Sequence, residues 1–302
     1  GCVSSTAAST VITVTEPLAP TVTGATACEG STTLGDYELS ATCSVVGEQV
    51  NWYDAAIGGT LLVSNSTTYT PASPSSLADG TYTYYASCED GNGCESARVA
   101  VTLVIDARPD APVIADETIC ENGTVNSLNA AAGSSYTVVG PSGSVGPLAT
   151  ITEADLTTAG LDVSTADTYS FSITTTNAAG CESLAGTFDI IVNPEPVVSS
   201  SIDETICAGA SAILTATSTP ANGSTIYTWY DDAGLTSSVG TGSTITVSPS
   251  ITTTYYVTAD LNGCVSSTAA STVITVTEPL VPTVTGATAC EGSTTLGDYE
   301  LT

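Results

Sequence analysis

The sequence predicts an all-β chain made of several small sandwich domains in tandem, and three observations lead to this prediction. Apolar and polar residues alternate with a period of two, as in residues 99–105, where every second side chain is bulky and apolar. Turn-forming pairs such as Asp79-Gly80 separate such runs. The sequence also repeats itself, which is typical of an array of similar domains. No window shows the period of an amphipathic helix.

The repeat is the strongest of these signals. Residues 1–40 return at 263–302 with two changes, Ala19 to Val281 and Ser40 to Thr302, at an offset of 262 residues. Near-identity over such a length indicates duplication within a long array. A weaker period of about 87 residues lies inside the long one.

Proline-rich junctions mark the start of each domain, and a Gly-Cys pair followed by an alternating strand marks its end. This pattern predicts domains at 17–107, 108–193 and 194–278, with 1–16 as the last strand of a preceding domain and 279–302 as the first strands of the next repeat. We expect the chain to be a window from a longer polypeptide. The alternative is a set of separate subunits that exchange an end strand.

Composition excludes several classes of function. The chain has no His and no Lys, and Arg98 and Arg108 stand against 31 acidic residues, for a net charge of -29. The usual groups for general-base catalysis near neutral pH are missing, so we expect no enzyme. Two arginines are too few to neutralise phosphates, so we expect no nucleic-acid partner and no insertion into anionic membranes. No apolar stretch reaches the length of a membrane span.

Ten cysteines without metal-type clustering predict disulfides and an exported, extracellular or cell-surface location. The second and third predicted domains hold one pair each, the first domain has the equivalent pair, and two further cysteines remain in the first domain. The predicted bonds are Cys120–Cys181, Cys207–Cys264, Cys28–Cys94 and Cys43–Cys88. Cys2 and Cys290 align with Cys264 and Cys28, and we expect their partners outside the printed residues; two unpaired thiols are the alternative.

A core disulfide between facing strands, with Trp52 on a strand between them in sequence, resembles the immunoglobulin arrangement. The runs Tyr-Thr-Trp-Tyr-Asp at 227–231, Thr-Thr-Thr-Tyr-Tyr-Val at 252–257 and Asn-Gly-Cys-Val-Ser at 262–266 resemble bacterial Ig-like repeat domains. Such domains occur in very large secreted surface proteins of Bacteroidota-type bacteria, often exported by the type IX system. The resemblance implies adhesion, cell-surface or fibre roles and specifies no ligand. Domain 108–193 departs from it, because Tyr136-Thr137 precedes two valines where the Trp-Tyr pair is expected, so its core must be filled differently.

Acidic residues gather near the proline-rich boundaries. Carboxylates from adjoining domains would together supply the several oxygens that Ca²⁺ requires, and the alternative is a solvated acidic surface. The predicted ligands are Glu16, Asp106, Asp110, Asp116, Glu117, Glu195, Asp203 and Glu204. The acidic segment 89–92 is predicted to be a tight turn instead of a cation site. Three Asn-x-Ser/Thr patterns predict glycosylation at Asn65, Asn122 and Asn222.

These observations together predict an extracellular structural fibre or stalk of tandem Ig-like repeats, whose partners are further copies of itself. The alternative is an adhesin or glycan-binding module of a large secreted surface protein, with surface glycans as partners. Calcium is the one cofactor that the sequence suggests.

Overall fold

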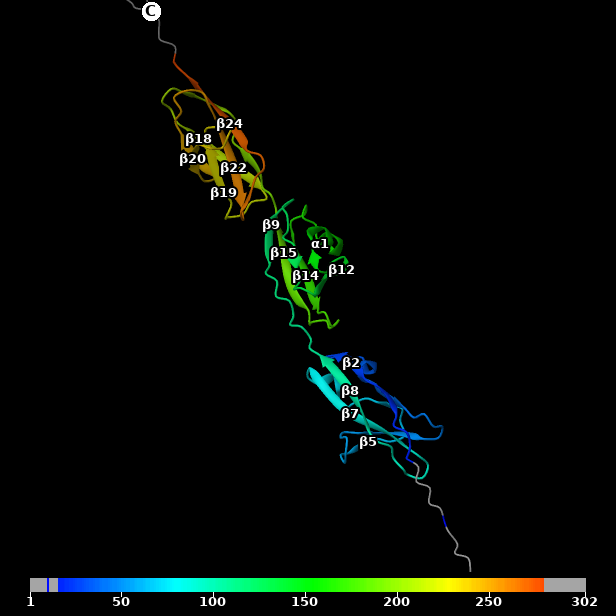
Figure 1. The fold of residues 1–302 in the computed structure, drawn as a ribbon. Helices are drawn as coiled ribbons and strands as arrows, with labels where there is room; N and C mark the ends of the chain where they lie inside the picture. Colours follow the sequence, from blue (N-terminus) through cyan, green and yellow to red (C-terminus); the bar gives the residue numbers. More distant parts are fainter. Residues whose placement is uncertain (1–9, 11–15, 280–302) are drawn as a thin grey trace, which may run out of the picture. The chain divides into compact units, whose positions relative to one another are not determined.

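The computed structural model describes residue 10 and residues 16–279 (Figure 1). Strands dominate the described elements, together with one α-helix and two short 3-10 helices, and the all-β fold class is confirmed. These residues form two compact units. One holds the described residues up to Asp116 with Val125–Leu161 and Tyr169–Asp189; the other holds Glu117–Thr124, Asp162–Thr168 and the residues from Ile190. The segment predicted as the second domain therefore contributes to both units.

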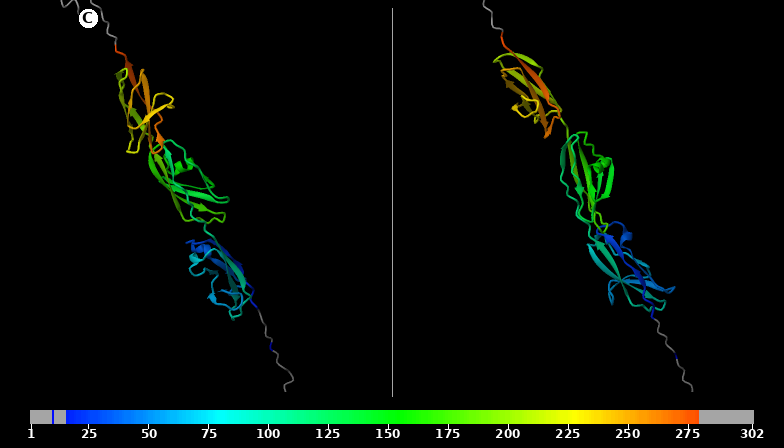
Figure 2. Two further views of the ribbon diagram at one scale, coloured as in Figure 1. Left: turned by 90° about the vertical axis from the view of Figure 1, so that its left-hand side faces the viewer. Right: turned by 45° about the horizontal axis from the view of Figure 1, so that its top comes forward.

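The first sandwich, blue to cyan in Figures 1 and 2, packs a three-stranded sheet of order β1-β3-β6 against a five-stranded sheet of order β2-β8-β7-β4-β5. Its strands are β1 (Thr21–Thr23), β2 (Ala25–Cys28), β3 (Leu39–Thr42), β4 (Gln49–Tyr53), β5 (Leu61–Val63), β6 (Thr68–Tyr69), β7 (Gly80–Glu89) and β8 (Val99–Asp106). Two 3-10 helices, η1 (Leu34–Tyr37) and η2 (Pro74–Ser76), lie between strands.

Side chains from both sheets meet in one core around Trp52, which is fully buried. Leu39 from the small sheet and Leu103 from the large sheet belong to the same cluster, as alternation along these strands requires. The indole N–H of Trp52 donates to the Ser66 carbonyl oxygen at 2.9 Å, so the buried nitrogen keeps a partner. The predicted strand 99–105 lies within β8.

The third sandwich repeats this plan, with a sheet of order β16-β18-β21 against one of order β17-β24-β22-β19-β20, in which β23 pairs with β22. Its strands are β16 (Val197–Ser200), β17 (Glu204–Cys207), β18 (Ala212–Thr219), β19 (Ile226–Tyr230), β20 (Ser238–Thr241), β21 (Thr244–Val247), β22 (Thr253–Leu261), β23 (Cys264–Val265) and β24 (Ala270–Thr277). Trp229 takes the place of Trp52, fully buried and donating to the Gly242 carbonyl oxygen at 3.0 Å.

The middle sandwich has a five-stranded sheet of order β12-β11-β14-β15-β9 and a two-stranded sheet of β10 and β13. Its elements are β9 (Glu117–Cys120), β10 (Leu128–Asn129), β11 (Ser135–Gly140), β12 (Gly143–Leu148), β13 (Thr150–Ile151), α1 (Glu153–Ala159), β14 (Asp167–Thr176) and β15 (Gly186–Asn193). Helix α1 was not predicted from the sequence.

The core of the middle sandwich is filled without tryptophan, as the departure from the Trp-Tyr pair required. Val138 of β11 is fully buried. The rings of Phe171 and Phe188 stack with centroids 5.3 Å apart, and α1 buries Leu156 and Ala159. Aromatic stacking and the short helix α1 thus replace the volume that an indole supplies in the other two sandwiches.

Each sandwich pairs a short early strand in parallel with its last strand: β2 with β8, β9 with β15 and β17 with β24. In every case a cysteine ends the short strand. This cysteine lies opposite the final residue of the last strand: Cys28 opposite Asp106, Cys120 opposite Asn193 and Cys207 opposite Thr277. Within residues 16–279, no helix has the length and apolar character needed to cross a bilayer.

Candidate functional site at the disulfide junctions

The three cysteines that end the short strands begin three turns of one shape, which we call the exit turns (28–31, 120–123 and 207–210). In each, the residue after the cysteine donates its backbone N–H to the carbonyl of the residue that lies opposite the cysteine on the last strand. The carbonyl of the cysteine accepts the N–H of the residue three positions further along the chain. A residue with positive φ lies between, namely Gly30, Asn122 or Gly209. The first bonds are Glu29 to Asp106 at 2.9 Å, Glu121 to Asn193 at 2.9 Å and Ala208 to Thr277 at 3.0 Å; the second are Ser31 to Cys28 at 3.0 Å, Gly123 to Cys120 at 2.8 Å and Ala210 to Cys207 at 3.0 Å.

A second set of equivalent turns precedes the last strand of each sandwich, and we call them the hairpin turns (90–96, 177–183 and 260–266). Each begins with Asp or Asn, whose side-chain oxygen accepts backbone N–H groups of the turn, and contains a glycine with positive φ directly before a cysteine. The acceptor bonds are from Asn92 and Cys94 to Asp90, both at 2.9 Å, from Ala179 at 3.1 Å and Cys181 at 2.9 Å to Asn177, and from Gly263 to Asp260 at 2.9 Å.

A buried serine two residues after the cysteine fastens each hairpin turn to the preceding long strand. Its N–H donates to, and its hydroxyl oxygen accepts from, the backbone of the same residue on that strand. Those residue pairs are Ser96 with Cys88, Ser183 with Thr175 and Ser266 with Ala259.

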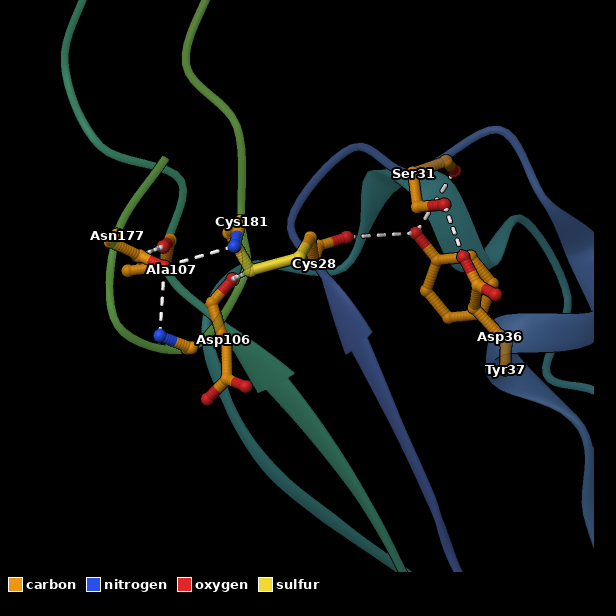
Figure 3. The surroundings of a disulfide bond; sticks show 9 residues. Cys28, Ser31, Asp36, Tyr37, Asp106, Ala107, Asn177 and Cys181 are labelled. Carbon is orange, nitrogen blue, oxygen red and sulfur yellow. Dashed lines mark hydrogen bonds between the residues drawn. A yellow bond between two sulfur atoms is a disulfide. The ribbon is translucent and has the colours of Figure 1, made fainter. Parts of the chain in front are cut away.

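Disulfides join exit turns to hairpin turns of the following sandwich. Cys28 bonds to Cys181, with 5.5 Å between the Cα atoms, and Cys120 bonds to Cys264, with 5.6 Å between them. Figure 3 shows the first of these bonds, between the end of β2 and the loop after β14. Each bond is a covalent connection between successive sandwiches in addition to the chain itself.

Polar contacts surround the first junction, defined as the Cys28–Cys181 bond and its two turns. The Cys181 sulfur lies 3.9 Å from the Asp106 carbonyl oxygen. The Asn177 amide nitrogen donates to the Ala107 carbonyl oxygen at 3.0 Å, so one side chain both shapes the hairpin turn and binds it to the linker (Figure 3). The buried Tyr37 hydroxyl lies 3.3 Å from the carbonyl oxygen of Cys28.

The second junction, the Cys120–Cys264 bond and its turns, has comparable contacts. The Cys264 sulfur lies 4.0 Å from the Asn193 carbonyl oxygen. The Glu121 carboxylate accepts the N–H of Glu195 at 3.0 Å, and the Glu195 carboxylate in turn accepts the N–H of Ser267. Hydrogen bonds from the side chain and backbone of Ser267 lower the pKa of Glu195, because they favour its charged form.

Three of the predicted disulfides are therefore wrong: Cys28–Cys94, Cys120–Cys181 and Cys207–Cys264. The reason lies in the strand geometry. Cys28 lies opposite the end of β8, whereas Cys94 precedes the start of β8, and the eight residues of that strand span about 23 Å. The same separation holds for Cys207 and Cys264 along β24. Disulfide partners have Cα atoms less than about 7 Å apart.

The remaining cysteine predictions have different outcomes. Cys43, directly after β3, and Cys88, within β7, form the predicted bond inside the first sandwich. Cys94 and Cys207 are exposed free thiols in the structure. Cys2 and Cys290 lie outside the described residues.

Several of the predicted calcium ligands accept backbone N–H groups. Asp116 accepts from Asp189 and Asp203 accepts from Val273, both at 2.8 Å, and these two bonds lie at equivalent places in their sandwiches. Figure 3 shows the Asp106 carboxylate pointing away from the disulfide.

The other predicted ligands lie at several places in the fold. Asp110 lines a surface hollow beside Glu29 and Arg108. Glu16 is exposed, and Glu117 and Glu204 begin β9 and β17.

Among residues 16–279, one group of three possible metal ligands lies within mutual reach: Cys43, Glu48 and Cys88. Its two sulfurs are bonded to each other and so do not offer thiolates. The predicted acidic residues do not converge in this way, and calcium binding stays a prediction. Thermal unfolding with Ca²⁺ and with a chelator tests it: a raised midpoint supports binding, and equal midpoints contradict it.

Residues 90–92 of the acidic segment lie in the first hairpin turn, as the sequence predicted, and Glu89 ends β7. Hydrogen bonds from the N–H groups of Cys94 and Asn92 lower the pKa of Asp90. The three predicted glycosylation sites, Asn65, Asn122 and Asn222, are all exposed. Glycosylation itself stays a prediction, which the intact mass of the native protein tests.

The sequence analysis missed the residues that shape the junctions, chiefly Asn177 and the turn serines. Their signal was present as a repeated pattern of Asp or Asn, three residues, Cys, one residue and Ser at 90–96, 177–183 and 260–266. The Gly-Cys pair alone indicates where the turns lie, but it does not indicate which contacts the Asp, Asn and Ser side chains make.

Solved structures of tandem domains resemble this chain at low sequence identity. The I-band fragment I67–I69 from titin is 12% identical, with 88% of this chain and 100% of that chain covered and a TM-score of 0.44. Drosophila OTK extracellular domains 3–5 are 11% identical, with 87% and 97% covered and a TM-score of 0.35. Fibronectin(III)-like modules of Clostridium thermocellum CbhA are 14% identical, with 86% and 94% covered and a TM-score of 0.25. No curated protein matches the chain.

A family model described as "Ig-like domain CHU_C associated" matches residues 17–106 and 195–277. The two matched regions make up more than half of the chain and contain the first and third sandwiches, in which Trp52 and Trp229 occupy the core. The chain therefore belongs to the family of Ig-like domains described as CHU_C associated.

Proposed function

We propose that this chain is a tension-bearing segment of an extracellular fibre or stalk made of tandem Ig-like sandwiches. The observation that supports this proposal is the disulfide across each of the two described junctions. Adjoining domains in a chain are ordinarily joined by one flexible linker and a weak interface. Here a second covalent connection runs beside the linker, so the two sandwiches stay joined at a short distance even when one of them unfolds.

The composition supports an exposed, crowded setting. Disulfides persist in oxidising, exported locations, and the family of this chain is consistent with such a place. A net charge of -29 makes neighbouring copies repel one another, which keeps parallel fibres from coalescing. The same charge and the absence of His and Lys support a role without catalysis.

Electron microscopy of the native material, with an antibody raised against this chain, tests the proposal. We expect the antibody to label elongated filaments at regular intervals, because the sequence repeats every 262 residues. Labelling confined to compact particles would contradict a fibre or stalk.

The alternative, an adhesin or glycan-binding module, makes a different prediction. It requires saturable binding to particular glycans on an array, and this binding should survive removal of Ca²⁺. Binding of that kind, with no filaments in the micrographs, would replace the fibre proposal.

A further inference from the structure

The two free thiols, Cys94 and Cys207, belong to the same two kinds of turn that form the junctions. Cys207 begins the third exit turn, and Cys94 lies in the first hairpin turn. Both bonded exit-turn cysteines pair with hairpin-turn cysteines, and never with each other. Each free cysteine is thus one half of a junction of which the structure shows two complete examples.

The backbone around Cys207 already has the bonded shape. Ala208 donates to Thr277 at 3.0 Å, against 2.9 Å for the equivalent bonds from Glu29 and Glu121 in the two complete junctions. This places the Thr277 carbonyl where Asp106 and Asn193 present theirs, 3.9 and 4.0 Å from the incoming sulfur. A hairpin-turn cysteine that approached Cys207 would therefore meet the same surroundings.

The backbone around Cys94 matches the bonded hairpin turns equally well. Asp90 accepts the Cys94 N–H at 2.9 Å, the distance at which Asn177 accepts that of Cys181. Gly93 has a φ of 82°, against 86° for both Gly180 and Gly263. One difference remains: Cys94 is exposed, whereas its bonded counterparts Cys181 and Cys264 are buried.

The repeat in the sequence indicates which domain would complete the two half-junctions at Cys207 and Cys94. Residues 279–302 repeat 17–40 with two changes, so the sequence that begins the first sandwich recurs directly after the third sandwich. The hairpin-turn cysteine of a first-type sandwich is Cys94. In such a junction, Ala97 would follow the hairpin-turn cysteine by three positions and Ala208 would directly follow the exit-turn cysteine. Both residues are small and uncharged, so neither would obstruct the bond.

We propose that Cys207 forms a disulfide with the Cys94 of a second copy of the repeat, so that every junction of the array is bridged in the same way. The inference depends on the shape of the turns and stands apart from the proposed fibre function. It extends the two observed junctions into a ladder in which each sandwich is bonded to the one before it and the one after it.

Formation of this bond needs an oxidant, for which we name a disulfide of the thiol–disulfide oxidoreductase class. The Cys207 thiolate attacks the disulfide of the oxidant, forms a mixed disulfide and releases one thiol of the oxidant. The Cys94 thiolate then attacks the Cys207 sulfur and displaces the second thiol. The two cysteines lose two electrons and two protons, and the oxidant becomes a dithiol.

The full chain provides a direct test, with Cys2→Ser and Cys290→Ser in all variants so that two other thiols do not react. One variant adds Cys94→Ser and keeps the Cys207 thiol; the other adds Cys207→Ser and keeps the Cys94 thiol. Each is incubated with oxidised glutathione, alone and as an equal mixture, and analysed on a denaturing gel without reductant. We expect each variant alone to remain at its 30.0 kDa mass and the mixture to form a covalent heterodimer of twice that mass. Dimers of either variant alone in the same yield as in the mixture, or no heterodimer, would overturn the proposal.

Native material gives an independent test. It also shows whether the partner thiol belongs to the same polypeptide or to a separate chain. Free thiols are blocked with N-ethylmaleimide, and the unreduced protein is digested with pepsin at low pH, where thiolate exchange is slow. We expect a linked pair of peptides that contain Cys207 and Cys94, and the blocking label on both would overturn the inference. If the bond lies within one polypeptide, reduction leaves the mass of the denatured chain unchanged; if it joins separate chains, reduction lowers it.

Discussion

At the scale of single residues, one serine fastens each hairpin turn to its sandwich. The Ser266 hydroxyl oxygen accepts the N–H of Ala259 at 3.2 Å, and Ser266 is only 7% exposed. A buried N–H that loses its acceptor costs about 1–3 kcal/mol, because water cannot replace the lost partner. The same contact recurs in all three sandwiches, which indicates that the cysteine beside it has to be held in place.

The substitution Ser266→Ala is therefore expected to lower the free energy of unfolding of the third sandwich by about 1–3 kcal/mol. Urea denaturation followed by the fluorescence of Trp229 measures this loss. Ser250→Ala is the matched control, because Ser250 is exposed, and its effect should stay within about 0.5 kcal/mol. Equal losses for the two variants would show that the buried hydrogen bond is not the cause.

Asp232 provides a test of how single carboxylates stabilise the loops. Its oxygens accept the N–H groups of Ser237 at 2.7 Å and Thr236 at 3.0 Å. Hydrogen bonds from the Ser237 backbone, followed by the Thr236 side chain, lower the pKa of Asp232 below its ordinary value of 3.8. A carboxyl with a lowered folded-state pKa adds stability that is fully present above 3.8 and is lost as the pH falls through the folded-state pKa.

We therefore expect wild type to be more stable than Asp232→Asn at pH 7, and the difference to shrink as the pH falls below 3.8. Thermal unfolding of both proteins at a series of pH values measures this difference. A difference that stays constant down to pH 2 would mean that the charge of Asp232 plays no part.

At the scale of elements, the long strands could be predicted from the sequence and the helix could not. The predicted run 99–105 lies within β8, because a strand with one buried face shows its period of two over many residues. Helix α1 has seven residues, two of them buried, which is too short for a helical period to appear. The Thr-x-x-Asp capping pattern at 152–155 was its one local signal.

That capping pattern determines whether α1 forms. Thr152 accepts the Asp155 N–H at 3.4 Å, and the Asp155 carboxylate accepts the Thr152 N–H at 2.8 Å. Thr152→Ala removes the hydroxyl cap and should cost about 1 kcal/mol, within the usual range of about 0.5–2. Thr158→Ala serves as the control, because its hydroxyl is exposed and donates to Ala154 within the helix. Denaturation midpoints of the two variants measure the difference, and equal midpoints would contradict a role for the cap.

At the scale of the whole molecule, the sequence predicted the disulfide within the first sandwich but not which domains the other cysteines join. Every sandwich has one exit-turn and one hairpin-turn cysteine, so pairing within a domain and pairing with the next domain use the same residues. The distinction is geometric, since the two cysteines of one sandwich lie at opposite ends of its last strand. Cys43 and Cys88 could be predicted because alternation turns both toward the core from the two facing sheets, with Cys43 directly after β3 and Cys88 in β7.

The junction disulfides determine how far the molecule extends under force. Without them, every residue from 17 to 278 would add to the length of the unfolded chain, except those in the loop closed by Cys43–Cys88. The distance between residues 17 and 278 would then reach about 730 Å. With them, the shortest covalent path runs from residue 17 to Cys43, across to Cys88, on to Cys120 and out through Cys264. This path extends to only about 250 Å, and the alternative route through Cys28–Cys181 is longer.

Single-molecule pulling between residues 17 and 278 tests this difference. We expect a total extension of about 250 Å for the bridged chain and about 730 Å for a variant with serine at residues 28, 181, 120 and 264. Cys94→Ser and Cys207→Ser in both proteins prevent links between molecules. The bridged chain should extend like the variant once a reductant is added, and further still because the Cys43–Cys88 bond also opens. A bridged chain that already extends to the length of the variant before reduction would show that the junction disulfides do not limit the extension.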